Sequence, residues 1–60
     1  MKTKLKKGET YMVWEPGMNE WLEMEYVGFN KLTDDHIFKS TQENNFYMYV
    51  NDSDVEDEVK

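Results

Sequence analysis

Aromatic side chains are the feature of this sequence that most clearly suits it to bind something. The chain of 60 residues contains two tryptophans, four tyrosines and three phenylalanines, more rings than the core of so small a domain can enclose. Tryptophan and tyrosine are enriched at binding hot spots, because each offers a large apolar surface with a polar group on it. We therefore predict an exposed binding surface. Its residues are Trp14, Trp21, Tyr47 and Tyr49, flanked by Glu23 and Glu25.

The acids beside these rings indicate which partner the surface suits. Glu23 and Glu25 favour a protein partner that is basic or that presents an apolar anchor. A second interpretation stays open. The two tyrosines would then line ordinary strands, for which tyrosine has a high propensity, and the two tryptophans would pack at the rim of the core.

The other residues that could do chemistry form no catalytic or metal-binding pattern. His36 could act as a general base, but catalysis also needs an acid or nucleophile in a water-excluding pocket, which sixty residues seldom enclose. The acids within residues 52–58 alternate as calcium ligands do, yet the glycine and the final glutamate of a calcium loop are missing. Cysteine is absent from the sequence. We expect no enzymatic activity, no metal and no cofactor.

Length and charge narrow the class of protein. Sixty residues suffice for one small domain, which we place over residues 1–60, with 1–4 as a loose basic arm and 5–59 as the folded part. The net charge of −6, with no arginine in the sequence, opposes binding to a nucleic-acid backbone. No apolar run approaches the length of a membrane span. We expect a cytoplasmic protein with no direct nucleic-acid or membrane partner.

Strands are the elements that must position the predicted surface. Apolar and aromatic residues fall in four short runs, at 10–14, 21–29, 36–40 and 46–50, separated by polar clusters. This spacing is typical of a small all-β barrel or sandwich. Alternation in the second and fourth runs separates a buried set from an exposed set that includes Tyr47 and Tyr49. The buried set is Leu22, Met24, Tyr26, Phe46, Met48 and Val50.

Turn-forming residues predict how these strands connect. The Pro-Gly pair at 16–17 favours a type II turn with positive φ at the glycine. Gly28 interrupts the second run and predicts a bulge that turns Phe29 inward. Residues 51–55 favour one 3₁₀ turn, and a brief fifth strand over 55–59 would close the barrel. Leu5 is the first residue expected to contact the core.

Several of these features occur in a familiar order. They are Gly8-Glu9 before the first strand, Trp14 at its end, the Pro-Gly turn, Trp21 opening a long bent strand, and Asp52-Ser53-Asp54-Val55 before the last strand. This order resembles the SH3-like barrel superfamily and, within it, the Tudor-type domains. The resemblance implies an all-β fold, a small five-stranded SH3-like barrel with a short 3₁₀ turn before the last strand.

Tudor-type domains that bind methylated side chains hold the cation in an aromatic cage. Trp14 and Trp21 match two walls of such a cage. The remaining walls in that family come from the end of the third strand and the turn after it, where residues 39–44 supply no ring. The resemblance therefore implies an incomplete cage.

A weaker resemblance concerns Trp21, the segment 27–29, Leu32-Thr33 and the strand at 46–49. These features are similar to the plasmid-encoded type II dihydrofolate reductases, small SH3-like chains that form tetramers around a shared pore. In that family a glutamine of this strand binds cofactor and substrate, and Tyr47 stands at the matching position. The resemblance supports the fold and leaves a homo-oligomer open, but argues against the activity.

Three functions remain to be compared. We expect a non-catalytic protein-interaction module, a stand-alone small acidic regulator or inhibitor that docks a partner through its exposed aromatic face. The first alternative is an acidic nucleic-acid mimic that blocks a DNA- or RNA-binding protein. The second alternative is a homo-oligomeric SH3-like assembly. Steep weakening of binding by salt would favour mimicry, and modest weakening would favour docking.

Overall fold

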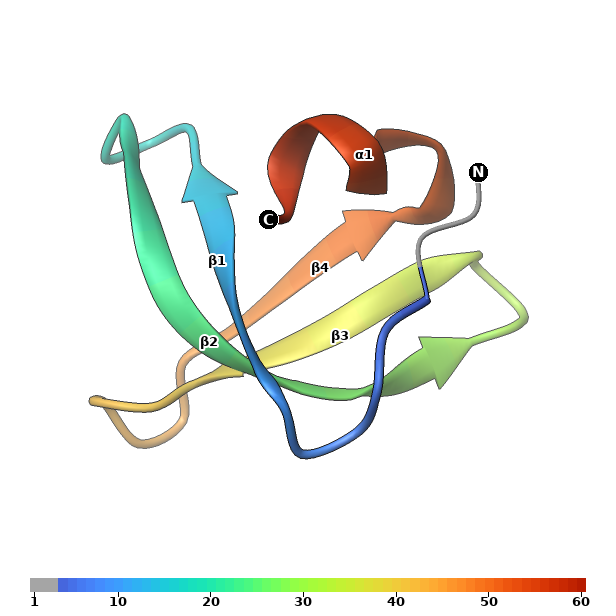
Figure 1. The fold of residues 1–60 in the computed structure, drawn as a ribbon, viewed down its shortest axis with the longest axis horizontal. Coiled ribbons are helices and arrows are strands. Elements are labelled where there is room, and N and C mark those ends of the chain that lie inside the picture. Colours follow the sequence, from blue (N-terminus) through green and yellow to red (C-terminus); the bar gives the residue numbers. More distant parts are fainter. Residues whose placement is uncertain (1–3) are drawn as a thin grey trace.

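Four antiparallel strands form one curled sheet in the computed structural model, which describes residues 4–60 (Figure 1). The strands lie in the order β1-β2-β3-β4, so each pairs with its neighbour in sequence. Two short helical turns follow β4. The elements are β1 (Thr10–Glu15), β2 (Glu20–Asn30), β3 (Asp35–Ser40), β4 (Tyr47–Asn51), η1 (Asp52–Asp54) and α1 (Val55–Glu58). The all-β prediction is confirmed at this level.

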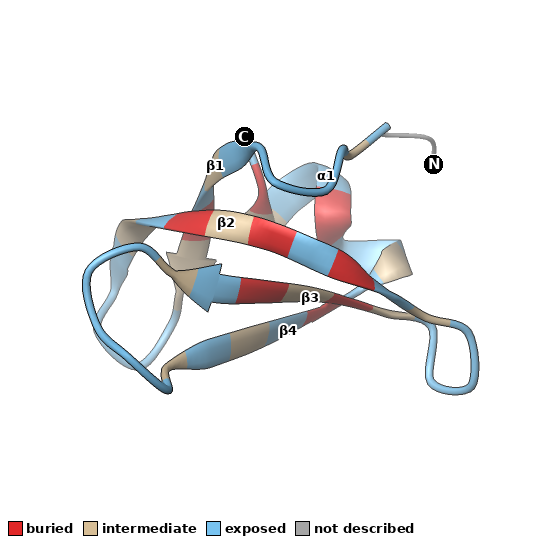
Figure 2. Cartoon of the chain, turned by 90° about the horizontal axis from the view of Figure 1, so that it is seen from below, coloured by how far each residue is buried: buried red, intermediate tan, exposed pale blue. Residues whose placement is uncertain are grey.

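The core lies on the inner face of the curled sheet. Figure 2 shows buried residues of β2 alternating with intermediate and exposed ones, as expected for a strand with one face covered. Within the predicted buried set, Met24, Tyr26 and Val50 are buried, and the other three are half-buried against the core. The predicted parity of both strands is therefore confirmed. The buried hydrophobic residues are Val13, Met24, Tyr26, Phe38, Val50, Val55 and Val59.

The predicted bulge in β2 is present. The register with β3 shifts between Tyr26 and Gly28, so that Phe29 comes to lie opposite the buried His36. The centroids of the Phe29 and His36 rings are 4.6 Å apart. The bulge thus turns Phe29 toward the face that carries His36, as predicted, but the ring lies next to the end of β2 and remains 42% exposed.

The connection between β1 and β2 differs from the predicted type II turn. Gly17 does not have a positive φ; Asn19, the last residue before β2, takes that conformation with φ of 57°. The Glu15 carboxylate fixes the loop by accepting a 2.9 Å hydrogen bond from the N–H of Met18. The other two connections also contain a left-handed residue, Asp34 or Asn45. Asparagine and aspartate tolerate this conformation better than other residues with a side chain.

The chain after β4 contains the predicted 3₁₀ turn but not the predicted fifth strand. The Asn51 side chain caps η1 by accepting a bond from the N–H of Ser53. Residues Val55–Glu58 then form a helical turn. The physical reason is side-chain placement: a strand would put Val55, Asp57 and Val59 on one face, whereas a helical turn buries only the two valines.

Closure of the sheet is limited to one short contact. Val59 forms an isolated bridge with Val13. The backbones of Met12 and Lys60 exchange two hydrogen bonds, each 2.8 Å long. The last two residues of the sequence thus cover the middle of the outer edge of β1.

The segment before β1 is held against β2. Leu5 packs against the core, as predicted. The N–H of Gly8 donates to the carbonyl of Tyr26, and the N–H of Tyr26 donates to the carbonyl of Glu9. Of the expected basic arm, residues 1–3 lie outside the described residues. Neither helical element within residues 4–60 has the length and apolar character needed to cross a membrane.

Candidate functional site

Strand pairing divides the predicted aromatic surface into two separate clusters. Trp14 and Trp21 lie opposite each other where β1 and β2 meet their connecting loop. Tyr47 and Tyr49 lie on β4, opposite Lys39 and Ile37 of β3. All four rings project from the outer face of the sheet, but β3 separates the tryptophan pair on β1 and β2 from the tyrosine pair on β4.

The tryptophan pair is partly covered by the chain itself. The two ring centroids are 5.4 Å apart with the planes inclined at 63°. The backbone N–H and C=O of Met12 bond to Lys60 and therefore point away from β2. Trp14, two residues further along β1, then forms a non-hydrogen-bonded pair with Trp21, the kind of pair in which facing side chains approach most closely. The Lys60 ammonium lies 4.2 Å from the centre of the Trp21 ring, within reach of a cation–π interaction. Both tryptophans are half-buried.

The tyrosine pair is open to solvent. Tyr47 is 45% exposed and Tyr49 is 62% exposed, and Ile37 beside them is half-buried. Buried tyrosines usually need a partner for the hydroxyl, whereas exposed ones present a large apolar face with a wet tip. This half of the predicted surface is therefore accessible to a partner.

The two predicted acids lie on β2 between the ring clusters. Glu23 is exposed and faces Met12, while Glu25 is half-buried and faces Thr10 on one side and Lys39 on the other. They do not surround the tyrosines, because Lys39 lies between Glu25 and Tyr47 in the sheet.

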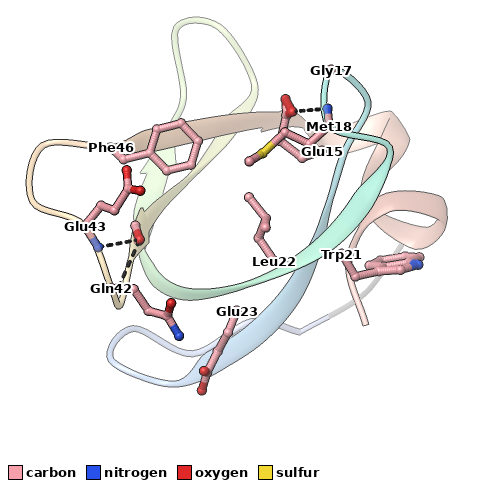
Figure 3. Close-up of a pocket in the computed structure, with 10 residues that line it drawn as sticks. Glu15, Gly17, Met18, Trp21, Leu22, Glu23, Gln42, Glu43 and Phe46 are labelled. Atoms are coloured by element: carbon pink, nitrogen blue, oxygen red, sulfur yellow. Dashed lines mark hydrogen bonds between the residues drawn. The ribbon is translucent and has the colours of Figure 1, made fainter.

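A cavity at one end of the curled sheet is the site that sequence reasoning missed. It measures about 620 Å³ and lies between the β1–β2 and β3–β4 loops. In Figure 3, Leu22, Met18 and Phe46 point toward its middle, with the carboxylates of Glu15 and Glu43 beside them. We call this space the mouth cavity. Trp21 and Glu23 also line it, but Figure 3 shows both pointing away from its middle.

The two loops that frame the mouth cavity are fixed by hydrogen bonds from side chains to the backbone. Glu15 accepts from the N–H of Met18 on one side. On the other side the Ser40 hydroxyl accepts from the N–H groups of Gln42 and Glu43, at 3.0 Å and 2.9 Å. Such bonds hold a loop in its turn without help from secondary structure. The cavity is thus framed by two ordered loops that come from distant parts of the sequence.

His36 belongs to a buried network that joins β2, β3 and η1. The Tyr26 hydroxyl lies 2.7 Å from His36 Nδ1, and His36 Nε2 lies 2.7 Å from an Asp52 carboxylate oxygen. With Asp52 ionised, Nε2 carries the proton and Nδ1 accepts from the tyrosine. Burial, followed by Tyr11 and Asp52, raises the pKa of the Tyr26 phenol above 10.0, its ordinary value.

Both ring nitrogens of His36 are engaged in these bonds. The acid that contacts His36 is Asp52 from η1, not Asp34 of the β2–β3 loop or Asp35 at the start of β3. Residues 4–60 contain no group of three acidic, histidine or cysteine side chains placed to hold a metal ion.

Comparison with protein-family models, with curated proteins and with solved structures finds no match for the chain. The likeness to SH3-like barrels is therefore one of architecture. A small all-β chain with a curled antiparallel sheet, a 3₁₀ turn and a short terminal bridge is compatible with that fold.

Proposed function

We propose that the protein is a non-catalytic interaction module that docks a positively charged segment of another protein at the mouth cavity. The fold we propose for it is an SH3-like barrel opened at one end. The curled sheet, η1 before the terminal segment and the Val13–Val59 bridge support this fold.

The observation that carries the proposal is the chemistry of the mouth cavity. Its floor is apolar, made by Leu22, Met18 and Phe46, and carboxylates of Glu15 and Glu43 flank it. None of the ten residues that line it is basic. A lysine or arginine side chain matches this arrangement, because its aliphatic stem packs on apolar surface while its charged head reaches an acid.

The charge of the whole chain favours the same class of partner. A net charge of −6 steers basic segments toward the surface and repels acidic ones. The tyrosine pair supplies a second exposed surface of the kind found at binding hot spots.

Selection from a library of random twelve-residue peptides displayed on phage tests this function. We expect the immobilised protein to select peptides rich in lysine or arginine. The Glu15→Gln/Glu43→Gln variant should bind the selected peptides about tenfold more weakly, since it loses two charge contacts. Each glutamine keeps an oxygen, so the bond from Glu15 to the Met18 N–H can persist.

The Glu56→Gln/Asp57→Asn variant is the matched control. It makes the same change in net charge on α1, where both residues are exposed and line no part of the mouth cavity. It should bind the peptides within about twofold of the unmodified protein. Equal losses in the two variants, or selection of peptides without basic residues, would contradict the proposal.

A further inference from the structure

We propose that the outer edge of β4 is a docking strand, with which an extended basic segment of another protein pairs through backbone hydrogen bonds. The inference rests on the proposed function in that both name a basic protein segment as the partner. It adds the conformation of that segment and a second surface that binds it.

Hydrogen bonding to β3 leaves one edge of β4 open. The N–H of Ser40 donates to the carbonyl of Phe46 at 2.9 Å. In the antiparallel register of β3 and β4, the even-numbered residues of β4 are then the ones bonded to β3. The N–H and C=O groups of Tyr47 and Tyr49 therefore point away from β3. Within residues 4–60 no other backbone group bonds to them.

The open edge lacks the features that usually protect one. Exposed edge strands commonly carry a lysine, a proline or a bulge that prevents pairing with another chain. Residues Tyr47–Asn51 contain no charge and no proline, and their register with β3 is regular. The two tyrosines on this edge are exposed. By contrast, the opposite edge of the sheet is covered at its middle by Lys60.

Charge identifies the occupant of this edge as a basic segment. An acid precedes β4 at Glu43, and two acids follow it at Asp52 and Asp54. A second copy of the chain, paired antiparallel through β4, would place these acids opposite one another, which is unfavourable. A strand with lysine or arginine at both ends places opposite charges there.

The open edge is continuous with the mouth cavity. Phe46 lies immediately before β4 and also lines the cavity. A strand added along β4 reaches the cavity at this residue. Strand addition of this kind obtains affinity from main-chain bonds and specificity from alternate side chains.

The probe for this proposal is a synthetic peptide of alternating valine and threonine with two lysines at each end. Amide hydrogen exchange is measured by NMR with and without the peptide. We expect exchange at the Tyr47 and Tyr49 amides to slow about tenfold on saturation. The Met48 and Val50 amides, which face β3, serve as internal references. A peptide with prolines in place of the valines should leave all four rates unchanged.

Two substitutions separate backbone pairing from contact with the ring. Tyr49→Val removes the ring and keeps the N–H, whereas Tyr49→Pro removes both. Because the Tyr49 N–H is not needed by β3, proline is tolerated on this edge. We expect the proline variant to bind the peptide about fivefold more weakly than the valine variant, the effect of one hydrogen bond.

The outcomes distinguish this inference from the proposed function. If the peptide perturbs only cavity residues and leaves exchange at Tyr47 and Tyr49 unchanged, the docking strand is wrong and the cavity proposal stands. If those two amides slow but Glu15→Gln, which changes a cavity acid on β1 and not an acid beside β4, leaves binding of the peptide unchanged, the docking strand stands and the cavity proposal is wrong. Slow exchange in the free protein, with a doubled mass by light scattering, would assign the edge to a second copy and contradict the inference. Failure of the peptide to bind would also contradict it.

Discussion

At the scale of single residues, the Tyr26–His36–Asp52 network shows how this small core includes polar groups. Both hydrogen bonds of the network are 2.7 Å long, and no buried polar side-chain atom among residues 4–60 lacks a partner. A buried hydrogen-bonding group without a partner costs about 1–3 kcal/mol. The network therefore holds η1 against the sheet by making its separation costly.

Replacing Tyr26 tests this cost. Tyr26→Phe keeps the ring and removes the hydroxyl that donates to His36 Nδ1, so we expect the free energy of unfolding at pH 7 to fall by about 1–2 kcal/mol. Tyr49→Phe, at an exposed position, is the control and should change it by less than about 0.5 kcal/mol. Urea denaturation followed by circular dichroism measures both. Equal stability of the two variants would show that the bond contributes nothing.

Tyr26 also makes the free energy of unfolding depend on pH in the alkaline range. Burial raises the pKa of its phenol in the folded state, so the unfolded chain loses this proton at a lower pH than the folded chain. The contribution of Tyr26 is fully present below pH 10 and is lost as the pH rises through the folded-state pKa. We expect the unfolding free energy to fall above pH 10 more steeply in the unmodified protein than in Tyr26→Phe. Parallel curves in urea titrations from pH 8 to about 11.5 would contradict this assignment.

At the scale of elements, each of the three strand connections contains one asparagine or aspartate with positive φ: Asn19, Asp34 and Asn45. Glycine adopts this conformation without steric cost, whereas alanine does not. We expect Asn19→Ala to lower the unfolding free energy by about 1 kcal/mol and Asn19→Gly to leave it unchanged or slightly higher. For a chain of this length, 1 kcal/mol shifts the melting temperature by about 4–8 °C. Identical melting temperatures for the two variants would argue against strain at this position.

The strands and their faces could be predicted from the sequence because alternation is a local signal. Leu22, Met24 and Tyr26 alternate with acids, and Gly28 marks the bulge where this alternation changes phase. The end of the chain could not be predicted in the same way. Valines four residues apart lie on one face of a strand and also of a helical turn, so Val55 and Val59 alone do not distinguish the two.

The alternation of residue types along single strands could predict only part of the binding surface. Alternation along β4 correctly placed Tyr47 and Tyr49 on the outside. It could not reveal that Lys60 lies over Trp21, since that contact depends on how the terminal segment returns to β1. The mouth cavity depends in the same way on two loops about 25 residues apart, and no local signal joins them.

At the scale of the whole molecule, a charge of −6 is carried by a body of 26 × 21 × 18 Å. At 0.01 M salt the screening length is about 30 Å, so the excess negative charge repels itself across the whole molecule, whereas at 0.1 M the screening length is about 10 Å. We expect added sodium chloride to raise the melting temperature over this range of salt concentration. A gain of about 0.5 kcal/mol in the free energy of unfolding corresponds to a rise of about 2–4 °C. The Glu56→Gln/Asp57→Asn variant should show a smaller rise in the same calorimetric scan. A melting temperature that falls with salt would mean that attractive pairs dominate instead.

The bonds between Met12 and Lys60 limit how many chains can join through their sheets. A fibril of paired strands grows only if every unit has two free sheet borders, because each unit must pair with one neighbour on either side. With the β1 border obstructed at its centre, residues 4–60 leave β4 as the unobstructed border, so strand pairing between copies cannot extend beyond a pair. Removal of Lys60 would free the second border and make open-ended polymerisation possible.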